Sequence, residues 1–146
     1  MIFSFLLTSL MAWCTPTTTP VTTTACQAKQ MVRKGIGDIP RGFTFLKGYP
    51  VDGKSGKRKR IEYSYILSRN SKYLITLATQ RNKSEGLQIT LLNARKKKIA
   101  SSYVDGKYYD GIQYKCQKTG IYYIRFTYDT KKTKNYCSGG ILSFRR

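Results

Sequence analysis

The sequence predicts an all-β protein: an antiparallel, jelly-roll-like β-sandwich of about seven or eight short strands, preceded by a short helical or irregular segment. Short runs of alternating apolar residues recur after residue 60, and turn-forming residues separate them. Helical periodicity is nearly absent from the same region. The strongest run, Gly120–Tyr128, is filled with β-branched and aromatic residues and is closed by Asp129. These observations are typical of an antiparallel sandwich or barrel, and we predict the sandwich.

The alternation within this strongest run assigns its two faces. The parity that contains Ile124 and Phe126 is expected to face the core, while Arg125 faces water. A second strand near Tyr136–Phe144 is expected to fold back on it as a hairpin across Asp129–Asn135. The expected core consists mostly of inward-facing side chains: Tyr65, Leu67, Ile75, Leu77, Ile89, Leu91, Ile112, Tyr122, Ile124, Phe126 and Leu142.

The elements before residue 60 are less regular. Cys26–Lys34 has the pattern of a short amphipathic helix, and Gly35 is expected to end it in the C′ position. The glycine-rich loop that follows contains alternating Phe43 and Phe45, which predict a small strand. Val51–Arg60 is rich in turn residues, lysine and arginine, and it predicts the basic tip of a hairpin.

Further strands are expected between residue 60 and the strongest run. They are short alternating segments bounded by polar residues: Ile61–Leu67, Tyr73–Thr79, Leu87–Leu92, Ile99–Tyr103 and Tyr108–Cys116. The tetrapeptide Val-Asp-Gly-Lys occurs at residues 51–54 and again at residues 104–107, and both copies are expected to form turns. No longer internal repeat is present.

The first residues predict export. Ile2–Trp13 is an apolar run too short to span a bilayer as a helix, but it suits the apolar region of a secretory signal peptide, although the usual basic residues before it are missing. Thr15–Thr24 is a low-complexity linker of threonine and proline. Residues 1–25 are therefore predicted to be signal peptide and linker, and residues 26–146 a single β-sandwich domain. The alternative is a buried N-terminal helix, which the polar tract directly behind the run disfavours.

Export would place the mature protein in the periplasm, at the cell surface or outside the cell, without a transmembrane span after processing. Lipidation at Cys14 is a disfavoured alternative. A bacterial lipobox has a small residue directly before its cysteine, whereas Trp13 is bulky.

Three cysteines follow the predicted signal peptide and are expected to be oxidised if paired: Cys26, Cys116 and Cys137. The hairpin predicted above would place Cys116 and Cys137 near opposite ends of a strand of about nine residues, ~30 Å apart. A disulfide needs Cα atoms within about 7 Å. Cys26 is therefore expected to bridge to one of the other two cysteines.

The charge of the chain points to anionic partners. There are 27 lysines and arginines against 7 carboxylates, a formal net charge of +20. Because export separates the protein from nucleic acid, the predicted partner is an acidic polysaccharide or an anionic envelope surface. The alternative is a structural or protein-interaction module whose charge only keeps it soluble, with an unspecified protein partner. The candidate binding residues form two basic runs: Lys54, Lys57, Arg58, Lys59 and Arg60, and Lys96, Lys97 and Lys98.

The sequence contains little catalytic chemistry. It has no histidine, the commonest general base and metal ligand. Asp105 and Asp110 could form a paired-acid or calcium site, but a glycine follows each of them, and Asp-Gly is first of all a turn signal. We therefore predict a non-catalytic protein without a metal site or cofactor.

The order of the strand motifs resembles the bacterial pre-peptidase C-terminal domain and related small secreted β-sandwiches, over about residues 61–146. The motifs are Tyr-x-Tyr-x-Leu, Tyr-Leu-Ile-Thr-Leu, Leu-Gln-Ile-Thr-Leu-Leu-Asn, Ile-Ala-Ser-Ser and Thr-Gly-Ile-Tyr-Tyr-Ile-Arg-Phe. The resemblance implies that Gly120, Tyr122, Ile124 and Phe126 belong to a core strand. It also implies a non-catalytic accessory module, here without an attached peptidase. Gly86 stands where the family usually has an aspartate before this strand type, so the resemblance does not support a calcium site.

Overall fold

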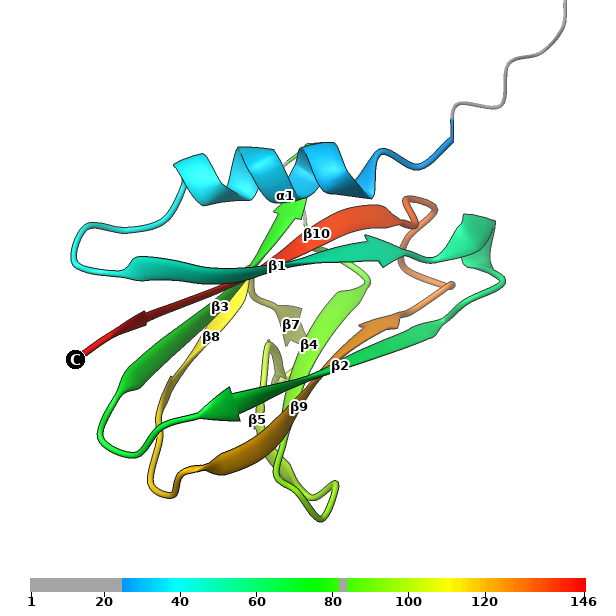
Figure 1. The fold of residues 1–146 in the computed structure, drawn as a ribbon. Coiled ribbons are helices and arrows are strands. Elements are labelled where there is room, and N and C mark those ends of the chain that lie inside the picture. Colours follow the sequence, from blue (N-terminus) through cyan, green and yellow to red (C-terminus); the bar gives the residue numbers. More distant parts are fainter. Residues whose placement is uncertain (1–24, 82–83) are drawn as a thin grey trace, which may run out of the picture.

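The computed structural model describes residues 25–81 and 84–146, and it confirms an all-β sandwich with a short helix (Figure 1). The predicted signal peptide, the linker and Cys14 lie outside these residues. The elements are α1 (Ala28–Gly37), β1 (Thr44–Asp52), a short 3-10 turn (Lys54–Gly56), β2 (Arg60–Leu67), β3 (Lys72–Thr79), β4 (Leu87–Leu92), β5 (Lys98–Ser101), β6 (Tyr103–Val104), β7 (Lys107–Tyr108), β8 (Gly111–Lys115), β9 (Gly120–Tyr128) and β10 (Cys137–Arg145).

Eight strands form two four-stranded antiparallel sheets. Sheet A has the order β1-β10-β3-β8, and sheet B has the order β2-β9-β4-β5. The pairs β1·β10, β2·β9, β3·β8 and β4·β5 join the first four of these eight strands to the last four. This arrangement is a long hairpin wrapped into two facing sheets, which is a jelly roll. The strands β6 and β7 form a small separate hairpin.

Two predicted hairpins are wrong. The strand β10 does not pair with β9, because β2 and β4 occupy both edges of β9, and β10 instead lies between β1 and β3 in sheet A. Residues 129–136 therefore cross from one sheet to the other. The basic segment Val51–Arg60 is likewise not a hairpin tip, since β1 belongs to sheet A and β2 to sheet B. Both segments are crossovers at the same end of the sandwich.

The helix α1 packs on the outer face of sheet A, above β1, β10 and β3 (Figure 1). It continues through Gly35 to Gly37, so the predicted stop at Gly35 is wrong. A Cβ atom at Gly35 would lie only 2.7 Å from Ile141 Cγ1 and 2.8 Å from Ala78 Cβ, so this glycine permits close packing of helix on sheet. The small strand expected at Phe43 and Phe45 corresponds to β1, which begins only at Thr44, so Phe43 lies outside it. The strand β1 is also longer than predicted, running for nine residues to Asp52.

The core between the sheets follows the predicted alternation. Tyr122, Ile124 and Phe126 of β9 are buried, and Arg125 lies on the outer face. Of the other predicted core residues, Tyr65 and Leu77 are only partly buried and pack at the margin of the core, and the rest are buried. Tyr128, which has the same predicted parity as Ile124 and Phe126, is buried as well. The list of core residues omitted several buried residues, which lie in β1 or at the ends of the predicted strands: Tyr49, Val51, Ile61, Tyr73, Leu87 and Cys116.

Candidate anion-binding ends of the sandwich

The two crossovers lie side by side and form what we call the crossover end, residues 53–60 and 129–136 (right-hand side of Figure 1). The Gly53 N–H donates to the Tyr136 carbonyl at 2.7 Å, and the Tyr128 N–H donates to the Lys59 carbonyl at 2.8 Å. Backbone hydrogen bonds thus join a basic segment of the first crossover to the second, which carries Lys131, Lys132 and Lys134.

The first crossover has an unusual backbone conformation, and its cations are exposed. The Asp52 carboxylate accepts a hydrogen bond from the Lys54 N–H at 2.8 Å, as in an Asx turn. Lys54, Ser55 and Gly56 then take left-handed φ values of 46°, 54° and 89°. Two such residues in succession without glycine are rare, and the ring of Tyr136 packs against Gly56. The predicted cations of this run are all exposed: Lys54, Lys57, Arg58, Lys59 and Arg60.

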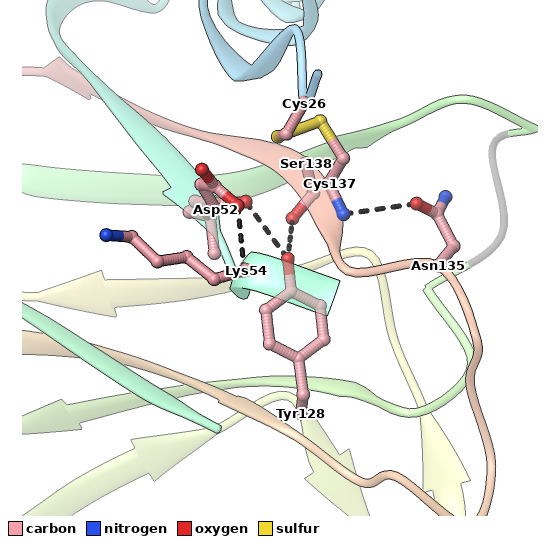
Figure 2. The surroundings of a disulfide bond; sticks show 8 residues. Cys26, Asp52, Lys54, Tyr128, Asn135, Cys137 and Ser138 are labelled. Atoms are coloured by element: carbon pink, nitrogen blue, oxygen red, sulfur yellow. Dashed lines mark hydrogen bonds between the residues drawn. A yellow bond between two sulfur atoms is a disulfide. The ribbon is translucent and has the colours of Figure 1, made fainter. Parts of the chain in front are cut away.

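A rigid framework lies beneath these loops (Figure 2). A disulfide joins Cys26 to Cys137, with the Cα atoms 5.4 Å apart. The Asn135 side-chain oxygen accepts a hydrogen bond from the Cys137 N–H at 3.1 Å. The prediction that Cys26 bridges one of the other cysteines is therefore confirmed. Cys116 is a buried free thiol at the opposite end, where its N–H donates to the Ser71 carbonyl at 2.9 Å.

Tyr128 ties the two crossovers to the core. Its hydroxyl donates to the Val51 carbonyl at 3.0 Å and shares a hydrogen bond of 2.8 Å with the Ser138 hydroxyl. Burial raises the pKa of Tyr128 to about 12. The hydroxyl is therefore protonated at neutral pH and can donate the hydrogen bond to Val51. The ring lies edge-on to Tyr136, with centroids 5.5 Å apart.

The positive charge of the crossover end is only partly offset, because its eight cations face three nearby carboxylates. Within the described part of the chain, the ion pairs are Lys96–Glu62 and Arg125–Glu62, and neither involves this end. Three carboxylates lie near this end. Asp52 accepts from a backbone amide, and Asp129 accepts from the Lys131 N–H and from the Tyr108 hydroxyl. Glu85 lines an open depression together with Lys132 and Lys134. The exposed cations are therefore available to an external anion.

The second predicted run, Lys96–Lys98, lies at the other end of the molecule. We call it the turn end; it comprises the turns at residues 68–71, 93–97 and 116–119, along the lower edge of Figure 1. The fold therefore separates the two predicted clusters. Lys96 pairs with Glu62 and lies over the Tyr123 ring, 3.0 Å from its centroid. The hydrogen bond from Lys96 lowers the pKa of the Glu62 carboxyl. Lys97 and Lys98 are exposed.

Several cations near these two ends were missed from the sequence. At the turn end the fold gathers four cations that are scattered along the chain: Arg69, Lys72, Lys115 and Lys118. Arg95 directly precedes the predicted run Lys96–Lys98 and could have been noticed in the sequence. At the crossover end they are Lys131, Lys132 and Lys134, whose near-continuous run could have been noticed in the sequence.

The carboxylates considered for chemistry belong to turns. Asp105 and Gly106 have φ values of 50° and 78° and form the two-residue turn between β6 and β7, as the sequence predicts. The Asp110 carbonyl accepts from the Leu77 N–H at 2.7 Å. Within residues 25–81 and 84–146, no three metal-ligating side chains come together. The helix in these residues is too short and too polar to cross a membrane.

Comparisons with known proteins give no family. No protein-family model and no curated protein matches this chain. Among solved structures, the chain is similar to PliG from Aeromonas hydrophila, a periplasmic inhibitor of g-type lysozyme. The two share 9% sequence identity with a TM-score of 0.44, over 71% of this chain and 87% of that one. A likeness of this size transfers neither a partner nor an activity to this chain.

Proposed function

We propose that this chain is a non-catalytic, exported binding protein that holds an acidic polysaccharide at its crossover end. The observation that carries this proposal is the gathering of eight exposed cations on two joined loops, unpaired with carboxylates among the described residues. They are Lys54, Lys57, Arg58, Lys59, Arg60, Lys131, Lys132 and Lys134.

An open depression at this end favours a sugar polymer over a simple anion. It has a volume of about 570 Å³, and its lining includes Lys54, Lys134 and the partly exposed ring of Tyr136, together with one carboxylate residue, Asp52. A sugar ring can stack on the aromatic face while its carboxylate or sulfate meets an ammonium group. Each exposed ion contact is individually weak, so affinity must come from many contacts along an extended polymer.

The disulfide supports the exported location. Disulfides persist mainly in oxidising compartments such as the periplasm and the extracellular space, and the Cys26–Cys137 bond closes the crossover end. An exported protein meets acidic polysaccharides of the cell envelope and its surroundings, and seldom meets nucleic acid.

The test is a charge-matched comparison of two variants. In the first, Lys57, Arg58, Lys59 and Arg60 become serine; in the second, the exposed cations Lys29, Arg33, Arg41 and Lys47, which lie elsewhere, become serine. We expect the first variant alone to lose at least about tenfold in affinity for polygalacturonate, measured by titration calorimetry over a salt series. Both should keep the parent stability within about 0.5 kcal/mol per site.

Equal losses in the two variants would mean that net charge alone drives binding. Absence of saturable binding at any salt concentration would instead favour the structural or protein-interaction module.

A further inference from the structure

An apolar pair stands exposed on the outer face of sheet B. Ile66 of β2 and Ile121 of β9 are cross-strand partners, and they are 63% and 50% exposed. They occupy the end of the β2–β9 ladder that adjoins the turn end, and together with Ser64 and Tyr65 they line an open depression of about 500 Å³. Sheet A has its outer face covered by α1, so this pair belongs to the more open side of the sandwich.

Cations surround this apolar pair. Arg95 and Lys118 line the same depression as Ile121, which has a volume of about 290 Å³. Arg69 belongs to the adjoining turn, where its N–H donates to the Thr119 hydroxyl at 2.9 Å. Together with their flanking residues (66–72, 92–98 and 115–121), the three turns contain eight lysines and arginines and no aspartate or glutamate. One of the eight, Lys96, pairs with Glu62 of β2.

We infer that the turn end docks onto a lipid bilayer with anionic headgroups. In this arrangement Ile66 and Ile121 enter the boundary between headgroups and acyl chains, while Arg69, Arg95 and Lys118 bind lipid phosphates. Interfacial binding of this kind combines a small buried apolar area with electrostatic attraction to anionic lipid.

Other occupants fit this surface less well. A stable protein interface buries about 800 Å² on each partner, and two isoleucines supply only a small part of that area. A second copy of this chain would bring two ends without free carboxylates, each carrying eight cations, against one another. A bilayer instead offers a continuous plane of negative charge beside an apolar layer, which matches both features.

The test uses the full-length protein as purified from cells, with vesicles of phosphatidylcholine alone or with phosphatidylglycerol, and measures co-sedimentation. Two double variants are compared with the parent: Ile66→Thr with Ile121→Thr, which keeps β-branched residues, and Arg69→Ser with Lys118→Ser. A charge-matched control carries Lys57→Ser with Arg58→Ser at the crossover end. All share the same N-terminal segment, so differences between them report on the substituted sites.

We expect binding to require phosphatidylglycerol. Loss of the isoleucine pair should lower vesicle affinity roughly tenfold. Loss of Arg69 and Lys118 should lower it by about 25-fold, at about fivefold per cation, with a clearly smaller loss in the control. The isoleucine variant should bind polygalacturonate like the parent. The two assays therefore test lipid binding at the turn end and polysaccharide binding at the crossover end separately. Parent-like vesicle binding by the isoleucine variant, equal losses in both charge variants, or a dimer that the isoleucine variant dissociates would each overturn the inference.

Discussion

Tyr128 lies where three segments of the chain meet. It is the last residue of β9, and its ring lies on the buried face of that strand. Its hydroxyl forms hydrogen bonds with Val51 of β1 and Ser138 of β10. A phenylalanine would fill the same space but would leave the Val51 carbonyl without this donor. A buried carbonyl without a hydrogen-bond donor lowers the stability of the fold. The hydroxyl of Tyr128 therefore helps to fix the loops that carry the candidate site.

The stability of the protein should fall in alkaline solution because of this residue and two others. Burial raises the pKa of Tyr128 to about 12, and it also raises the pKa of Tyr49 and Tyr122. The unfolded chain releases these protons near pH 10, before the folded protein does. The three protonated tyrosines therefore make their full contribution to the free energy of unfolding below about pH 10, and this contribution is lost as the pH rises toward about 12.

Urea unfolding between pH 8 and pH 11.5 measures this effect. The Tyr128→Phe variant should be less stable than the parent by about 1 kcal/mol at pH 8. The difference should shrink as pH rises, because the variant lacks one of the three late-titrating groups. A constant difference across this range would contradict the assignment.

A substitution at Ile124 tests which face of β9 is buried. It is fully buried, opposite Tyr63 of β2 and Leu91 of β4. Ile124→Ala should lower the free energy of unfolding by about 2–5 kcal/mol, since it leaves a cavity between the sheets. The matched control is Ile121→Ala in the same strand, which should change stability by no more than about 0.5 kcal/mol. Similar losses in both variants would show that the inner and outer faces are wrongly assigned.

At the scale of elements, α1 is held to sheet A by close packing and by one covalent bond. The disulfide Cys26–Cys137 links the segment before the helix to the start of β10, with a sequence separation of 111 residues. Gly139 of β10 lies against the helix backbone, and a Cβ atom there would meet the Val32 nitrogen at 2.7 Å. The helix therefore depends on the sheet for its position.

Removing the disulfide should destabilise the fold without abolishing it. A variant with Cys26→Ser and Cys137→Ser should lose about 2–4 kcal/mol of unfolding free energy, because a long loop in the unfolded chain is no longer closed. Reduction of the parent with dithiothreitol should give the same loss in chemical denaturation. An unchanged midpoint in both experiments would mean that the bond contributes nothing to stability.

These elements also show which features the sequence could predict. Alternation in Gly120–Tyr128 identified a strand and its buried face, because side-chain direction has a period of two. It could not identify the neighbours of that strand, since facing a core does not specify a partner, and the expected hairpin was wrong. The local sequence around Gly35 predicted a helix end. The structure instead shows that a glycine is needed there because the helix packs closely against Ile141.

Some residues of the candidate site could be predicted from the sequence, and others could not. The run Lys57–Arg60 was visible because its members are consecutive, and the structure places it on an exposed crossover. Arg69 and Lys118 were not visible, because separate turns bring them together. Arg95 was omitted although it directly precedes Lys96 in the sequence. Lys96 was predicted as a free cation, yet it pairs with Glu62 from a strand 34 residues away. Polyanion binding by either cluster stays a prediction.

At the scale of the whole molecule, the exposed isoleucine pair of the turn end and the loops of the crossover end lie at opposite ends of β9. Among the turn-end cations, Lys96 reaches back to Glu62, two residues from Arg60. The strand β9 runs from the turn end to the crossover end, and nine residues span ~30 Å at about 3.3 Å per residue. At physiological ionic strength the screening length is about 8 Å, so a charge bound at one end is hardly felt at the other. A protein with two independent anion-binding ends can bridge two anionic partners that would otherwise repel each other.

Bridging is the expected behaviour if both proposals hold. Vesicles with phosphatidylglycerol should recruit fluorescent polygalacturonate only when the protein is present, as measured by co-sedimentation of the dye. The variant with serine at residues 57–60 should still bind vesicles but recruit little polymer, because its crossover end has lost half of its eight cations. The Ile66→Thr and Ile121→Thr variant should bind polymer in solution but fail to bring it to vesicles. Undiminished recruitment by either variant would show that the ends do not act separately, since a +20 protein could then coat both surfaces through its net charge alone.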